Sequence, residues 1–288
     1  MFKPIVGIML LCNVGYTEGS QMQKYMIFEY PNTLKYINFD SQQVENVDFD
    51  FGILSELREI THANWLSNGM LLVSDYGLNI SLFNITNGAI TTLPIKGDCA
   101  ITIAESSTIL FILNEKGKRS LVTYDIDTNN LQVLSSIEGS SNIACPIKLN
   151  EDEYVYVSKY QDEFEVDIDV FNKRTLKSEP LKKNTYLPRL FVKGLGLIVF
   201  NGKRHYLLNE ELKSTKLKWI KYGERPIFYD EKKNIVFLRQ YKDSVLTGSS
   251  GAIWIYDLNT NKKHKLMENL YPIQILEDRL NEVKVDGN

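Results

Sequence analysis

The chain has 288 residues, of which 43% are hydrophobic and 24% are charged, and its formal net charge at pH 7 is −3. A chain of this length can bury a sizeable core, and its slight acidity argues against a nucleic-acid partner, which normally requires a basic face. The 16 tyrosines and 13 phenylalanines favour strands. No apolar stretch reaches about 18 residues, so no transmembrane segment is expected.

The N-terminal residues 1–19 combine one positive charge with the apolar run Ile5–Leu11, followed by Cys12 and a polar stretch. This order is typical of a signal peptide or a lipoprotein signal, and it predicts an exported protein that is periplasmic or anchored to a membrane by lipid. The alternative is an ordinary strand in a cytoplasmic protein.

A short motif recurs along the chain, in which an aromatic or aliphatic residue precedes a polar turn. Its clearest copies are Tyr124–Asn130 and Tyr256–Lys262. All six copies begin at Ile37, Phe83, Tyr124, Phe171, Leu208 and Tyr256, at spacings of 46, 41, 47, 37 and 48 residues. A period of about 44 residues is typical of a β-propeller, in which each repeat forms one blade.

Taken in chain order, each repeat predicts four short strands joined by turns. The best-formed repeat has strands at 225–229, 234–240, 252–257 and 262–266. The other complete repeats run over 59–95, 99–137, 145–181 and 186–219, with apolar second strands at 69–74, 108–113, 153–158 and 196–200.

The first repeat is incomplete, because only 24–30, 34–39 and 44–49 supply strands. Residues 271–276 follow the last repeat and can provide the missing inner strand, which would leave no free sheet edge. We therefore predict an all-β, six-bladed β-propeller of four-stranded antiparallel blades, closed by strands from both termini, as a single domain over residues 20–288. Strands at 279–285 and 4–12 would change the blade count.

The repeat resembles that of TolB-type, WD40-like propellers, whose pattern joins a proline before the second strand to a later Tyr-Asp-x-x-Thr. Here the proline recurs at Pro146, Pro188, Pro226 and Pro272, and the second part is clearest at 124–128 and 256–260. The resemblance covers most of residues 24–276 and implies the fold rather than an activity.

Recognised catalytic and cofactor motifs are missing from the sequence. It contains no Gly-x-Ser-x-Gly, His-Glu-x-x-His, Cys-x-x-Cys or phosphate-binding loop, so no cofactor or metal is predicted. Alternating carboxylates at 162–169 could line a calcium site, but they are better interpreted as a solvated strand face. The basic run 212–221 predicts an outer strand with a solvated lysine face.

Aligning the repeats places six residues just before the inner strands, around one mouth of the predicted channel. They are His62, Cys99, Cys145, Leu187, Arg225 and Tyr271. His62, Arg225, Tyr271, Cys99 and Cys145 form the candidate ligand- or partner-binding site, although such residues can also merely line an entrance. Because equivalent positions on neighbouring blades are usually too distant for a bridge, Cys99 and Cys145 are expected to be free, buried thiols.

The function that fits these observations is non-enzymatic binding of a protein partner by a monomeric propeller, such as an exported inhibitor or immunity-type protein. The candidate anchors are loop tyrosines, each of which could instead pack on its own blade: Tyr76, Tyr160, Tyr186, Tyr222 and Tyr241. The alternative is a lyase or lactonase that uses His62, Arg225 and Tyr271 at the channel mouth.

Overall fold

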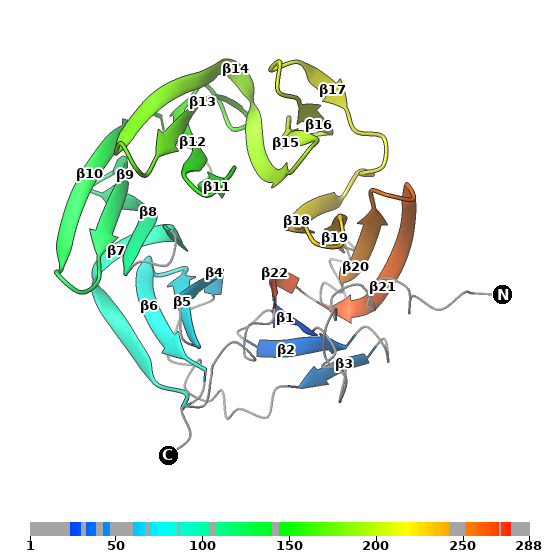
Figure 1. The fold of residues 1–288 in the computed structure, drawn as a ribbon, viewed down its shortest axis with the longest axis horizontal. Helices are drawn as coiled ribbons and strands as arrows, with labels where there is room; N and C mark the ends of the chain where they lie inside the picture. Colours follow the sequence, from blue (N-terminus) through cyan, green and yellow to red (C-terminus); the bar gives the residue numbers. More distant parts are fainter. Residues whose placement is uncertain are drawn as a thin grey trace. The chain divides into compact units, whose positions relative to one another are not determined.

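The structure is a computed structural model, and every regular element in its described part is a β-strand (Figure 1). It describes residues 24–29, 33–38, 43–46, 60–66, 69–85, 87–103, 107–139, 144–241, 251–270 and 272–277. The predicted signal over 1–19 and the additional strands at 4–12 and 279–285 lie outside these ranges. Within them, no helix is long and apolar enough to cross a membrane.

The chain divides into two compact units, residues 56–222 and residues 1–55 with 223–288. The unit 56–222 contains two sheets of seven strands each, in the orders β10-β9-β8-β7-β6-β5-β4 and β11-β12-β13-β14-β15-β16-β17. In the first sheet the strands are β4 (Ile60–Leu66), β5 (Met70–Asp75), β6 (Asn79–Asn84), β7 (Ile90–Thr102), β8 (Thr108–Glu115), β9 (Lys118–Asp125) and β10 (Asn130–Ile137). In the second they are β11 (Ile147–Lys148), β12 (Glu153–Tyr160), β13 (Glu165–Asn172), β14 (Lys177–Val192), β15 (Gly196–Phe200), β16 (His205–Leu208) and β17 (Ser214–Lys216).

Two long strands each take part in two successive four-stranded sheets. The first part of β7 pairs with β6, as in Ser81 with Thr92, and its second part pairs with β8, as in Gly97 with Leu113. Strand β14 connects β13 to β15 in the same way. The unit therefore consists of four antiparallel four-stranded sheets, which correspond to the four repeats predicted between residues 59 and 219.

The other unit contains two four-stranded antiparallel sheets. One is formed by β18 (Glu224–Asp230), β19 (Ile235–Tyr241), β20 (Gly251–Asp257) and β21 (Lys262–Leu270). The other has the order β22-β1-β2-β3, with β1 (Lys24–Glu29), β2 (Thr33–Asn38), β3 (Gln43–Asn46) and β22 (Pro272–Glu277). Strand β22 pairs with β1, for example Ile275 with Ile27, so strands from both ends of the chain share this sheet.

The hydrogen bonds of the recurring turn explain why its sequence repeats. Asp257 accepts bonds from the amide nitrogen and the hydroxyl of Thr260, at 3.2 and 2.8 Å. Asn261 has a left-handed φ of 54°, which asparagine tolerates better than most residues, and its Oδ1 accepts a bond of 3.1 Å from the Tyr256 hydroxyl. The equivalent residues Tyr124, Asp125, Thr128 and Asn129 make the same set of bonds.

The core lies between neighbouring sheets, because the central strands of each sheet are covered on both faces. In the unit 56–222, Tyr154, Tyr156 and Phe171 are almost completely buried in one apolar cluster that extends from β7 to β16. In the other unit, Ile275 of β22 is fully buried against Ile235, Phe237 and neighbouring residues of β18–β21. Burial on both faces accounts for the nearly continuous apolar second strands.

The basic run 212–221 forms a strand over only part of the predicted length. Strand β17 covers Ser214–Lys216 and pairs with β16, where Tyr206 faces Lys216. Because β16 begins at His205, it offers no pairing partner to the residues that follow Lys216. Instead, Leu217 and Ile220 turn inward and are buried, while the intervening Lys218 is exposed.

Candidate functional site

One edge of the unit 56–222 carries four of the six residues that the repeat alignment singled out, and we call it the disulfide edge. It comprises His62, Cys99, Cys145 and Leu187 with the neighbouring turns 76–78, 116–117, 161–164 and 201–204. Each of these turns follows the second strand of a sheet. The end of that second strand pairs with the start of the inner strand, as Asp75 of β5 does with Ile60 of β4 and Phe200 of β15 does with Leu187 of β14. The shared strands β7 and β14 keep these ends on the same side of successive sheets.

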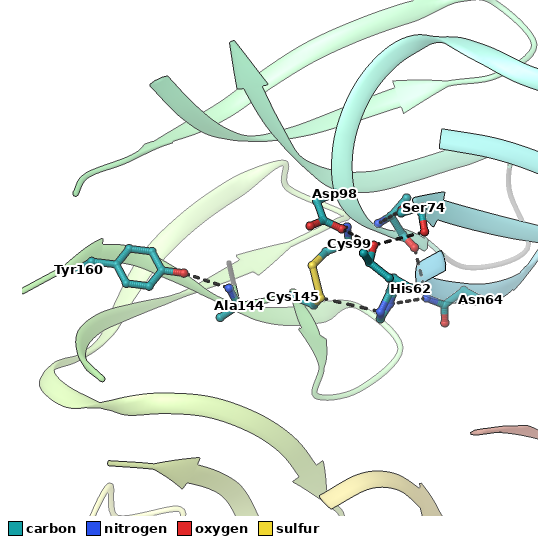
Figure 2. Close-up of a disulfide and its surroundings, with 10 residues drawn as sticks. His62, Asn64, Ser74, Asp98, Cys99, Ala144, Cys145 and Tyr160 are labelled. Carbon is teal, nitrogen blue, oxygen red and sulfur yellow. Dashed lines mark hydrogen bonds between the residues drawn. A yellow bond between two sulfur atoms is a disulfide. The ribbon is translucent and has the colours of Figure 1, made fainter. Parts of the chain in front are cut away.

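Cys99 and Cys145 form a disulfide, so the expectation of free thiols is wrong (Figure 2). Their Cα atoms are 5.0 Å apart, within the usual range for a bridge. The two sheets approach closely here, because the amide of Glu138 donates to the Ser158 carbonyl and the amide of Tyr160 donates to the Glu138 carbonyl, both at 2.9 Å. Cys99 and Cys145, at equivalent positions of two repeats, are therefore close enough for a bridge, contrary to the expectation from the sequence.

A bulge in β7 positions Cys99 for the disulfide. The pairing with β8 is interrupted between Asp98 and Ile101, and Cys99 has a left-handed φ of 59°. This conformation costs on the order of 1–3 kcal/mol for a residue other than glycine. Asp98 stabilises it, because its Oδ1 accepts a 2.7 Å bond from the Cys99 amide and a 3.0 Å bond from the Thr61 hydroxyl.

Burial raises the pKa of Asp98, and the bonds from Cys99 and Thr61 partly offset this effect. The amide of Ala100, on the other side of Cys99, donates to the Ser74 hydroxyl at 3.2 Å. The bulge is thus held from both sides by polar groups of the neighbouring strands.

His62 lies between Asn64 and the disulfide, as Figure 2 shows. The Asn64 side-chain nitrogen donates to the Ala100 carbonyl at 3.2 Å and lies 2.9 Å from His62 Nε2. The Ala100 carbonyl can only accept a hydrogen bond, so the side-chain nitrogen of Asn64, and not its oxygen, must face Ala100 and His62. Because this nitrogen is a donor, His62 Nε2 must be the acceptor. The proton of the neutral ring is therefore on Nδ1, 3.8 Å from Cys145 Sγ.

The surrounding protein desolvates the imidazole of His62 and lowers its pKa to about 4. The ring is consequently neutral at pH 7 and donates a weak Nδ1–H bond toward sulfur. Cys99 is only 2% exposed, whereas Cys145 is partly exposed. His62 and the disulfide therefore form an uncharged lining of this edge at pH 7.

The structure brings together three of the five predicted site residues, namely His62, Cys99 and Cys145. Arg225 is an exposed residue of β18 in the other unit. Tyr271 lies outside the described residues. Leu187, which shared the alignment, is fully buried on β14.

The proposed tyrosine anchors fall into two groups. Tyr76 and Tyr222 are 75% and 85% exposed, and both belong to the unit 56–222. Tyr160 is buried, and its hydroxyl accepts a 3.0 Å bond from the Ala144 amide. Tyr186 packs on Tyr206 with ring centroids 5.2 Å apart. The side chain of Tyr241 is outside the described part.

A basic pocket at the same edge was not recognised from the sequence. It has a volume of about 550 Å³ and is lined by Lys203, Arg204, Lys216, Leu217, Lys218, Ile220 and Tyr222. The sequence contained both contributing segments, but only the pairing of β16 with β17 brings residues 203–204 beside residues 216–222. The basic run 212–221 was the feature of the sequence that pointed to this pocket.

No family model and no curated protein matches this chain. Solved structures do: a TolB-type protein from Agrobacterium tumefaciens has a TM-score of 0.57 at 10% identity, covering 91% of this chain and 100% of that one. TolB from Acinetobacter baumannii has a TM-score of 0.57 at 13% identity, covering 87% and 63%. An oligogalacturonate lyase in complex with manganese has a TM-score of 0.50 at 12% identity, covering 85% and 73%.

At these identities the similarity concerns architecture and not chemistry. The all-β architecture of antiparallel sheets is shared with TolB proteins, and the TolB-like resemblance of the repeat is confirmed at the level of the fold.

Proposed function

We propose that this chain is a non-enzymatic binding protein and that it holds a protein partner on the disulfide edge. The observation that carries the proposal is the exposure of two large tyrosines there, Tyr76 at 75% and Tyr222 at 85%. Tyrosine is enriched among the residues that dominate interface energies. Tyr76 lies in the turn after β5, and Tyr222 lies between β17 and β18.

We further propose that residues 20–288 form a single six-bladed propeller whose ring is closed by β22 and β1. Support comes from the four-stranded sheets and from the pairing of the two chain ends. Such a scaffold would keep the turns of the disulfide edge rigid, which reduces the ordering cost of binding. An inhibitor or immunity-type protein is one form that this binding could take.

Export to the periplasm or to a membrane surface is part of the proposal. Disulfides persist in oxidising compartments and are rare in the cytosol, so the Cys99–Cys145 bridge supports export. Fractionation of host cells, combined with N-terminal sequencing of the mature chain, tests this point. A cytoplasmic protein with reduced cysteines and an intact Met1 would contradict it.

Capture of partners from an extract of the native host tests the binding function. The wild-type chain should retain a partner at near-equal stoichiometry, and Tyr76→Ser and Tyr222→Ser should each reduce affinity by about tenfold or more. Val133→Ser is the matched control, because Val133 is 57% exposed but lies within the outer strand β10. Failure of the wild-type chain to retain any stoichiometric partner would refute the function.

A further inference from the structure

The basic pocket is built by two segments whose geometry is fixed by the backbone. In the turn after β15, Asn201 Oδ1 accepts bonds from the amides of Lys203 and Arg204, at 3.1 and 2.8 Å. On the other side, the amide of Leu217 donates to the His205 carbonyl at 3.0 Å. The cationic side chains therefore extend from a preorganised frame.

The four cations of the pocket have no acidic partner among the described residues. Lys203, Arg204, Lys216 and Lys218 are all exposed, and no ion pair involves them there. Nearby Lys213 differs, because its Nζ lies 2.7 Å from Glu211. Four like charges around one pocket raise the local positive potential in a chain whose net charge is −3. An anionic group is the complementary ligand.

The remaining lining residues are apolar or aromatic. Leu217 and Ile220 are 9% and 7% exposed, whereas the ring of Tyr222 is largely in solvent. A purely ionic ligand would leave the exposed Tyr222 side chain uncovered. The pocket thus combines an apolar part with a cationic rim, which suits an apolar side chain flanked by carboxylates.

We propose that this pocket binds an acidic segment of a partner protein, with one apolar side chain of the segment packed against the exposed Tyr222. The proposal rests on the proposed binding function and names the chemistry of the partner. A volume of about 550 Å³ accommodates a few side chains. A nucleic-acid duplex would instead require a more extensive basic face than this overall acidic chain carries.

The probe is a short synthetic peptide in which glutamates surround one phenylalanine, carrying a fluorescent label for anisotropy measurements with the full chain. We expect saturable binding that weakens as ionic strength rises, because salt screens exposed charges. Lys216→Ala and Lys218→Ala should each weaken binding by about two- to fivefold, and Lys216→Glu should weaken it further. Lys213→Ala is the matched control and should bind like wild type.

Two further peptides test the two halves of the ligand. Replacing the phenylalanine by alanine should weaken binding by about fivefold or more, as expected for the loss of a buried aromatic contact. A peptide with lysines in place of the glutamates should not bind. Thermal melts of each variant confirm that the exposed substitutions leave the fold intact.

The proposal is overturned if the Lys216 and Lys218 variants bind the acidic peptide as tightly as wild type, or if the lysine peptide binds equally well. It is also overturned if oligogalacturonate or vesicles of anionic phospholipid displace the peptide and bind more tightly, since the ligand would then not be a protein segment. If the host partner is captured equally by wild type and Lys216→Glu, the pocket assignment fails while the binding function stands. If wild type captures no partner, the function itself fails.

Discussion

At the scale of single residues, His62 shows how a polar side chain becomes part of the lining of the edge. The Ala100 carbonyl fixes the orientation of Asn64, Asn64 fixes the acceptor nitrogen of the imidazole, and the remaining proton points to Cys145 Sγ. The repeat alignment placed His62, Cys99 and Cys145 at equivalent positions, and the structure brings them into contact. The alignment could not show their bonding, because a bulge and a left-handed φ at Cys99 leave no sequence signature.

The lowered pKa of His62 makes a pH-dependent contribution to stability. The folded-state value is about 4, below the ordinary value of 6.5, so between these pH values the unfolded chain binds more protons. Stability should therefore fall as pH drops from about 6.5 to about 4. The unfolding free energy should fall by an amount on the order of 2 kcal/mol. This is less than the full pKa shift implies, because His62 is partly exposed.

Urea denaturation of wild type and His62→Gln across this pH range measures the effect. The difference in unfolding free energy between the two chains should shrink as the pH falls. The raised pKa of Asp98 has the opposite effect on stability, which it increases as the pH falls. Because both chains contain Asp98, its contribution cancels in the difference. A difference that does not vary with pH would show that His62 is not desolvated.

At the scale of elements, the recurring turn was the most predictive feature of the sequence. Its strand positions are confirmed within one or two residues at most places, because the Asp and Thr side chains bond locally and need no distant partner. The basic run 212–221 was predicted less well. Whether it continues as a strand depends on where β16 begins, which is a property of another segment.

The left-handed asparagine of the turn should be sensitive to substitution. Asn261→Ala should destabilise the chain by about 1–2 kcal/mol, because alanine disfavours positive φ and leaves the Tyr256 hydroxyl without its acceptor. Asn261→Gly should cost less, since glycine tolerates this φ. Equilibrium denaturation of the two variants compares them directly, and equal losses would mean that the hydrogen bond alone matters.

The disulfide joins the sheet of β7–β10 to the segment before β11, closing a loop with a sequence separation of 46 residues. Removing it by Cys99→Ala with Cys145→Ala should lower stability by about 2–4 kcal/mol. The melting temperature of wild type should fall on addition of dithiothreitol, and that of the double variant should not change. Equal sensitivity of both chains to the reductant would contradict the bridge.

At the scale of the whole molecule, the pairing of β22 with β1 ties the two ends of the chain together. Ile275→Ala should cost about 2–4 kcal/mol, because Ile275 is fully buried. It should also speed hydrogen exchange at the amides of Tyr25–Glu29, which pair with β22. Unchanged exchange in β1, despite a lower overall stability, would show that β1 does not depend on this strand.

Partner binding at the disulfide edge is the central claim, and hydrogen exchange of the chain with and without its captured partner tests it most directly. We predict protection in the turns 76–78 and 201–204 and in the segment 217–223, which carry Tyr76, the basic pocket and Tyr222. The turns 126–129 and 173–176 at the opposite ends of the strands should exchange at unchanged rates. Protection confined to 126–129 and 173–176 would contradict the account.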